Sequence, residues 1–217
     1  MPSWFKFLLF LKLRIPVILV LLVFSVNCLA QRTEKLEITP FYGWQLSDQI
    51  YNEEKEISIE NSSDFGFSFN FPVANKPGLR GEVFYSRQNT SLTAKKDGSS
   101  DNITFFNMSV EYFHAGATYQ ENYGIFSPIF LITVGAARFS PKHTEYEDEW
   151  RVSAAIAFGL KAYLISQLGI RIQTRLLLPL QLGSGSIFCS SNQCLLSVEA
   201  GIVTLQADIT AGVIIAL

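Results

Sequence analysis

The feature that most constrains this chain is a regular alternation of apolar and polar residues over long segments. From Asp64 to Phe71, four phenylalanines occupy every second position and share one face, while Asp, Gly, Ser and Asn share the other. Side chains alternate between the two faces of a β-strand, whereas an α-helix repeats every ~3.6 residues. The pattern therefore predicts strands that have one apolar and one polar face.

Eight segments of this kind follow one another, with lengths that suit tilted strands crossing a membrane. They are Glu37–Leu46, Asp64–Phe71, Leu79–Gln88, Ile103–Tyr119, Ile125–Phe139, Arg151–Lys161, Ile170–Leu178 and Leu205–Leu217. The segment Ile125–Phe139 is apolar on both faces, which leaves its register open. No internal repeat or low-complexity linker indicates a second domain.

The connections between these segments alternate between long and short. The long ones are Ser47–Ser63, Asn89–Asp101, Ser140–Glu149 and Gln181–Val203, and the short ones are Val73–Gly78, Gln120–Gly124 and Leu164–Leu168. With eight antiparallel strands, all short turns fall on the side of the two termini. Short periplasmic turns and long external loops are typical of outer-membrane barrels. The sequence predicts an all-β fold, an eight-stranded antiparallel up-and-down transmembrane β-barrel.

The first thirty residues have a different organisation. Three basic residues precede an uncharged apolar run from Ile15 to Phe24, and small residues follow it. This order predicts a cleavable signal peptide over residues 1–30, with the barrel domain over residues 31–217. A retained membrane helix is the alternative, but Lys12 and Arg14 leave a span shorter than the ~20 apolar residues that a helix needs.

Cleavage removes one of the three cysteines and leaves Cys189 and Cys194, which are separated by Ser, Ser, Asn and Gln. An even pair in an exported chain predicts a disulfide bond, with free thiols as the alternative. The pair lacks the further Cys or His ligands of a zinc site. We expect neither a metal nor a cofactor.

Alternation alone does not decide which face points outward. A soluble lipocalin-like secreted binding protein would enclose its apolar stripe around a ligand, whereas a membrane barrel exposes that stripe to lipid. Three features favour the membrane barrel. The last strand ends at the final residue, aromatic residues lie near strand ends (Tyr42, Trp44, Tyr85, Tyr112 and Trp150), and the polar face carries both signs of charge.

The charges of that polar face are predicted to fill the barrel interior as ion pairs. They are the anions Glu37, Asp64, Glu82, Glu111 and Asp208 and the cations Arg80, Lys161, Arg171 and Arg175. Eight strands enclose a space only wide enough for side chains, and an unpaired charge there is costly. The interior is therefore expected to be plugged.

Taken together, these residues resemble the small bacterial outer-membrane β-barrels of the opacity-protein and OmpA-like superfamily. The resemblance rests on the segments Ile38–Trp44 and Glu82–Gln88, on the Phe-rich strand, and on the closing strand. The closing strand is similar to the family's assembly signal, with Thr210, Gly212, Ile215 and Leu217 as its matching residues, although it ends in Leu where the family has Phe. The resemblance implies insertion by the barrel-assembly machinery into the outer membrane of a bacterial cell, in contact with membrane lipid and lipopolysaccharide.

The function predicted for such a barrel is that of a structural or surface-interaction scaffold that acts through its external loops. A narrow conduit for small hydrophobic or ionic solutes is the alternative. Only 17% of the residues are charged, against about 25% in average proteins, and 17 basic residues oppose 19 acidic ones, so no nucleic-acid partner is expected. The sequence does not identify the external partner.

Catalysis is not expected either. Lipid-modifying barrels that hydrolyse use a serine activated by a histidine and an acid. Only His114 and His143 are present. His143 shares a loop with Ser140 and Glu145, with no strand to hold the three together, and His114 is expected near the membrane interface. The sequence therefore predicts no catalytic residues.

Overall fold

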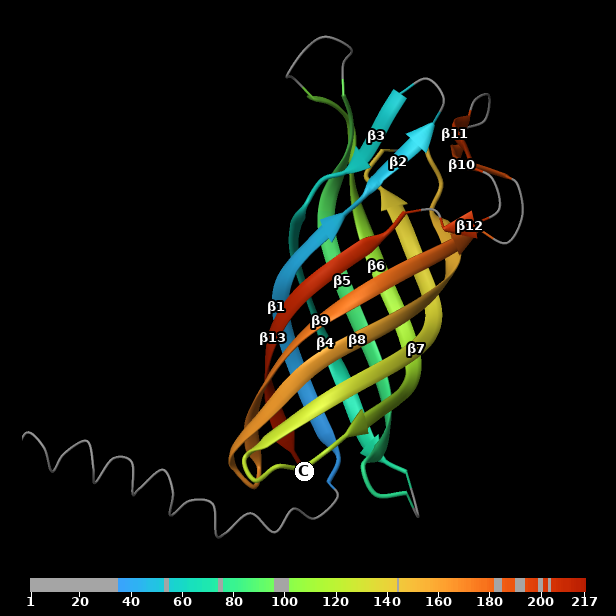
Figure 1. Cartoon of the computed structure of the whole chain (residues 1–217). Coiled ribbons are helices and arrows are strands. Elements are labelled where there is room, and N and C mark those ends of the chain that lie inside the picture. Colours follow the sequence, from blue (N-terminus) through green and yellow to red (C-terminus); the bar gives the residue numbers. More distant parts are fainter. Residues whose placement is uncertain are drawn as a thin grey trace, which may run out of the picture.

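The computed structural model describes residues 35–52, 55–73, 76–95, 102–143, 145–181, 185–189, 194–198, 201–202 and 204–217 (Figure 1). The predicted signal peptide, residues 1–30, lies outside them. The described strands are β1 (Glu37–Ser47), β2 (Gln49–Asn52), β3 (Lys55–Ile59), β4 (Ser62–Pro72), β5 (Leu79–Lys95), β6 (Asn102–Gln120), β7 (Phe126–Pro141), β8 (Glu149–Ile165), β9 (Leu168–Gln181), β10 (Gly185–Cys189), β11 (Cys194–Val198), β12 (Gly201–Ile202) and β13 (Gln206–Ala216). Among these residues there is no helix long and apolar enough to span a membrane.

Eight of the strands form a closed antiparallel barrel. They pair in the order β1, β4, β5, β6, β7, β8, β9 and β13, and β13 pairs with β1 to close the circle. The C-terminus and the short turns lie at one end, whereas the ends of β2, β3, β10, β11 and β12 lie at the other (Figure 1). The predicted eight-stranded up-and-down barrel is confirmed.

The two faces of each strand differ as the alternation predicts. In β4, Phe65 and Phe67 are exposed on the outer surface, whereas Asp64 and Ser68 are buried inside the barrel. In β13, Ile209 and Val213 are exposed on the outer surface, whereas Asp208 is buried inside the barrel. A soluble barrel would place these apolar side chains inside, so the structure rejects the lipocalin-like alternative.

The register of β7 follows from its pairing with β6 and β8. Ser127, Leu131 and Thr133 face the interior, whereas Ile132 and Val134 are exposed outside. Leu131 fills the interior where a polar residue would otherwise be expected, which explains why the segment is apolar on both faces.

The external connections contain more β-structure than the sequence predicts. Strands β5 and β6 extend their pairing up to Lys95 and Asn102, so most of the predicted loop 89–101 is strand. Within the predicted loop 47–63, β2 pairs with β3, and β3 adds to the edge of β5. The buried side chains of Ile59, Leu92 and Ala94 explain the extension, because they continue the apolar packing beyond the membrane-crossing part.

The short turns at the other end are tight. Gly78, between β4 and β5, and Gly124, between β6 and β7, have φ angles of 80° and 63°. Glycine adopts this left-handed conformation without the steric penalty that other residues meet. The chain can therefore reverse within a few residues at the end that also carries the C-terminus.

Candidate functional site

The barrel interior holds eight of the nine charged residues predicted for it. The buried cations are Arg80, Lys161, Arg171 and Arg175, and the buried anions are Glu37, Asp64, Glu82 and Asp208. The four positive and four negative charges balance. They form two clusters at different depths, one near the short turns and one farther toward the external end.

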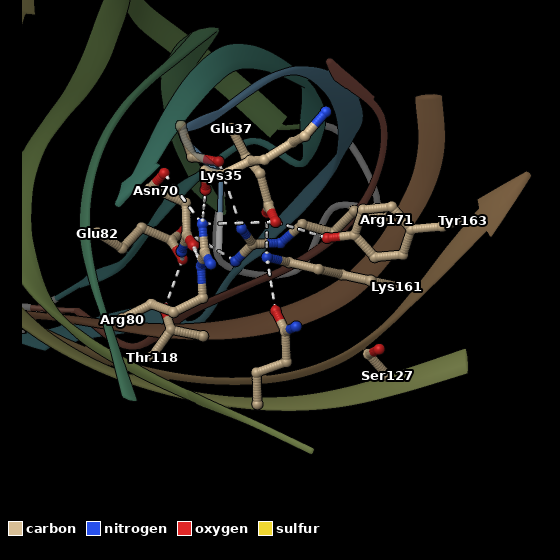
Figure 2. A network of polar contacts seen from close by, with 12 residues as sticks. Lys35, Glu37, Asn70, Arg80, Glu82, Thr118, Ser127, Lys161, Tyr163 and Arg171 are labelled. Carbon is tan, nitrogen blue, oxygen red and sulfur yellow. Dashed lines mark hydrogen bonds and ion pairs between the residues drawn. The ribbon is translucent and has the colours of Figure 1, made fainter. Parts of the chain in front are cut away.

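The cluster near the short turns is organised around Glu37 (Figure 2). Its carboxylate accepts a hydrogen bond from Lys161 Nζ at 2.6 Å and another from the Tyr163 hydroxyl at 2.7 Å. Arg80 Nη2 lies 3.5 Å from the same carboxylate and also donates to the backbone carbonyl of Lys35. These contacts join β1, β5 and β8 across the lumen.

Glu82 is the second anion of this cluster (Figure 2). Arg171 Nη2 lies 2.8 Å from it, and it accepts hydrogen bonds from Asn70 Nδ2 at 2.8 Å and Thr118 Oγ1 at 2.6 Å. The partners come from β9, β4 and β6. Buried charges that are paired and hydrogen-bonded in this way avoid the large desolvation cost of isolated ones.

The second cluster is built on Arg175. Its guanidinium lies between the rings of Phe41 and Phe84, with centroids 4.4 and 4.7 Å away. Its Nε donates to Asp208 at 2.8 Å, and its Nη2 lies 3.3 Å from an oxygen of Asp64. Stacking between two rings and pairing with two carboxylates holds a planar guanidinium in one orientation.

Toward the external end, apolar side chains join uncharged polar ones such as Gln88 and Thr90 in the interior. Buried side chains that share one packed cluster there are Ile59, Leu92, Ala94, Phe106, Met108, Val110, Ala137, Phe139, Ala155 and Leu177. Tyr146 from the loop after β7 packs against them. This layer was not predicted, because the inward face of a strand was expected to stay polar along its whole length.

Strand β6 contains the one predicted interior charge that is not inside. Tyr112 and His114 are buried in the lumen, so Glu111, which precedes Tyr112 and pairs with Arg87 and Arg138, points to the outer face, contrary to the prediction. The same one-residue shift places Tyr112 inside, where an interfacial position was predicted. The cause is the apolar layer described above. Beyond the membrane-crossing part, the inward positions Met108 and Val110 are apolar, and the alternation changes its sense.

His114 was expected near the membrane interface and instead lies in the lumen. Its Nδ1 is 3.0 Å from Thr133 Oγ1, and its ring stacks on Phe84 with centroids 4.9 Å apart. The other histidine, His143, contacts the ring of Tyr146. The described contacts of both rings are thus with aromatic side chains and one threonine.

The predicted assembly signal forms the seam of the barrel. Thr210 is buried, Ile215 and Leu217 point outward, and Gly212 lies opposite Phe41. A Cβ on Gly212 would lie 2.6 Å from the carbonyl oxygen of Pro40, so only glycine fits without a backbone shift. The seam therefore depends on close contact between the first and last strands.

The predicted disulfide lies at the tip of the hairpin formed by β10 and β11. The backbones of Cys189 and Cys194 are paired across the hairpin. Their side chains lie outside the part that the structure describes, so the bond stays a prediction.

No family model and no curated protein sequence matches the chain. Solved structures do. Neisserial surface protein A is 11% identical, with a TM-score of 0.56 over 84% of this chain and 97% of that chain. The outer-membrane protein OprG from Pseudomonas aeruginosa is 12% identical, with a TM-score of 0.52 over 86% and 95%. The outer-membrane protein AlkL, solved in lipid bilayers, is 14% identical, with a TM-score of 0.50 over 87% and 92%.

At these identities the likeness concerns the fold. The chain and these proteins share a closed barrel, and here that barrel carries its polar side chains inside and a continuous apolar surface outside. The chain therefore has the fold of the small eight-stranded outer-membrane β-barrels, and its apolar outer face is the surface of a barrel that lies in such a membrane.

Proposed function

We propose that the protein is a plugged outer-membrane barrel that serves as a structural or surface-interaction scaffold through its external segments. The observation that carries this proposal is the filled interior. Balanced ion pairs occupy the lumen near the short turns and at mid-depth, and apolar side chains occupy it toward the external end. An eight-stranded barrel leaves little room beside such side chains.

The external end offers the surface on which a scaffold could act. The extended β5–β6 pair, the β2–β3 hairpin on its edge and the β10–β11 hairpin all lie on that side of the barrel (Figure 1). Segments carried by a rigid framework are where proteins commonly place their binding residues. The proposal includes lipid and lipopolysaccharide as neighbours, insertion by the barrel-assembly machinery, and no enzymatic activity.

A conduit for small apolar solutes is the second candidate. It is favoured by the apolar layer around Met108, Val110 and Leu177, which would accept such solutes from the external side. The Arg175 cluster beneath it would then have to be bypassed or displaced, at the cost of exposing buried charges.

One experiment separates the two candidates. The purified chain is inserted into planar bilayers and into liposomes, with a general porin as positive control. A plugged scaffold gives no reproducible conductance steps and no faster uptake of an apolar dye. A conduit accelerates dye uptake, and Met108→Lys, which places a charge in the apolar layer, abolishes the acceleration. Reproducible ion conductance by the wild-type chain would overturn the plugged interior.

A further inference from the structure

The misassigned Glu111 belongs to a row of charged and aromatic residues on the outer face of the barrel. Arg87, Glu111, Arg138 and Trp150 are direct neighbours across β5, β6, β7 and β8. Directly paired residues point to the same side of a sheet. We refer to these four residues as the arginine row.

The arginine row lies at the upper boundary of the apolar outer surface. Toward the short turns, the same faces carry exposed apolar residues, among them Val83, Phe113, Val134 and Val152. Directly beyond the row, toward the external end, they carry uncharged polar groups, such as Ser91 and Asn107, whose side chains are hydrogen-bonded at 3.0 Å. The exposed apolar residues Phe105 and Ile103 of β6 lie farther out. A boundary between apolar and polar faces, marked by Tyr85 and Trp150, is where lipid headgroups meet a membrane protein.

One buried carboxylate holds two arginines in this row. Glu111 is only 5% exposed, and it accepts hydrogen bonds from Arg87 Nη1 at 3.3 Å, Arg138 Nη1 at 3.1 Å and the Tyr85 hydroxyl at 2.8 Å. The side chains of Arg87 and Arg138 are 36% and 35% exposed. Glu111 therefore lies beneath two guanidinium groups that face the surroundings of the barrel.

The two arginines are not equally engaged. Arg138 also binds Asp148 of the external loop through Nε and Nη2 and lies over the Trp150 ring at 5.6 Å. Arg87 has, besides Glu111, a contact with the Tyr85 hydroxyl and a 3.4 Å contact from Nε to Asn89. Arg87 thus has weaker contacts than Arg138, and its side chain is 36% exposed. The row itself carries two positive charges against one negative charge.

We propose that the arginine row binds the phosphate group of a phosphorylated outer-leaflet glycolipid, with Arg87 as its main donor. The planar guanidinium suits a phosphate because it can donate two parallel hydrogen bonds. The apolar residues below the row would contact the acyl chains of the same lipid. This inference rests on the outer-membrane placement proposed above and adds a specific lipid contact to it.

The test uses the full mature chain in a non-ionic detergent. Native mass spectrometry measures the binding of two ligands, phosphorylated lipid A and dephosphorylated lipid A. Wild type is expected to prefer the phosphorylated form about tenfold, and Arg87→Gln to lose that preference. Lys142→Gln removes an equal charge from the external loop and should leave the preference unchanged. Inorganic phosphate at the same concentration as the lipid is expected not to compete.

A second variant separates a lipid site from an internal ion pair. Glu111→Gln removes the carboxylate that competes for both arginines, so binding of the phosphorylated lipid should be at least as tight as in wild type. Glu111→Gln weakening this binding as much as Arg87→Gln, or equal binding of both lipids by wild type, would overturn the proposal, as would competition by inorganic phosphate. Absence of the protein from outer-membrane fractions would instead overturn the placement on which the proposal rests.

Discussion

At the scale of single residues, the interior depends on charges whose partners come from distant parts of the chain. Arg175 shows this most clearly, because two rings and two carboxylates from four other strands surround its guanidinium. The buried charges of this cluster are paired only when all of its members are present. Removal of its central cation would leave two carboxylates close together in a space that is closed to water.

Replacement of Arg175 by Met is therefore expected to destabilise the barrel by about 3–5 kcal/mol, since it leaves Asp64 and Asp208 without their cation. Urea unfolding of the protein in lipid bilayers measures this loss. The triple variant Arg175→Met, Asp64→Leu, Asp208→Leu removes the whole group and should recover most of the stability. A single variant as stable as the wild type would show that the cluster is not held as described.

Asp148 in the external loop gives a prediction about pH. A hydrogen bond with Ser140 and the guanidinium of Arg138 hold the pKa of its carboxyl below the ordinary value of 3.8. A group whose pKa is lowered on folding stabilises the fold above its unfolded-state pKa, and this contribution is lost as the pH falls through the folded-state value. We expect the Arg138–Asp148 contact to persist at pH 4 and to break in more acidic solution. A carbon-13 NMR titration of the Asp148 carboxyl checks this, with Asp148→Asn as control, and a midpoint at or above the ordinary value would contradict it.

At the scale of strands, the distribution of apolar and polar residues over the two faces depends on whether that part of the strand is surrounded by lipid or by water. Apolar outward residues and polar inward residues identify the membrane-crossing part of the barrel strands other than β7, because lipid lies outside and paired charges lie inside; β7 also carries the apolar Leu131 inside. Above the membrane the outside is water and the inside is an apolar layer. An alternation read as one continuous pattern therefore misplaces Glu111, Tyr112 and His114 by one residue.

The sequence did not reveal where along each strand the inward face changes from polar to apolar. Leu92, Met108 and Phe139 are inward-facing apolar residues in the upper parts of their strands, and their periodicity could have revealed the apolar layer if the upper parts had been read separately. The pairing of individual charges was also out of reach. It depends on the relative stagger of neighbouring strands, and the sequence of one strand does not contain that information.

The outer face leads to a prediction that depends on depth. Ile132 and Leu164 have similar exposed fractions, 53% and 56%, but Ile132 lies midway along β7 whereas Leu164 lies at the end of β8 near a short turn. Ile132→Arg is expected to destabilise the membrane-inserted barrel by about 2–4 kcal/mol and Leu164→Arg by at most about 1 kcal/mol. Unfolding in bilayers measures both variants. Equal costs would contradict the assignment of Ile132 to the centre of the lipid-facing surface.

At the scale of the whole molecule, the barrel is closed by its two terminal strands. Pairing of β1 with β13 extends from Glu37 opposite Ala216 to Ser47 opposite Gln206. A backbone hydrogen bond from Leu217 to Leu36 completes this end of the seam, and one from Ala216 to Gln167 joins β13 to the turn before β9 on its other side. The last residues are thus part of the wall as well as of the predicted assembly signal.

Deletion of residues 215–217 should therefore lower the amount of folded barrel in the outer membrane several-fold. The heat-modifiable band of fractionated membranes on gels measures it. Leu217→Phe, which restores the residue that the resemblance leads one to expect, should keep the level at or above that of the wild type. An unchanged level after the deletion would show that neither the seam nor the signal needs these residues.

The balanced interior also bears on the order in which the molecule can be made. Lys161 pairs with Glu37, which is 124 residues away in the sequence, and Arg175 pairs with Asp64, which is 111 residues away. A half-built sheet would face the hydrocarbon with these charges unmatched, which is a costly state. Insertion into the membrane and closure of the barrel should consequently occur together. The interior charges are all paired only when the strands have assembled in the correct order, so they disfavour incorrectly assembled barrels.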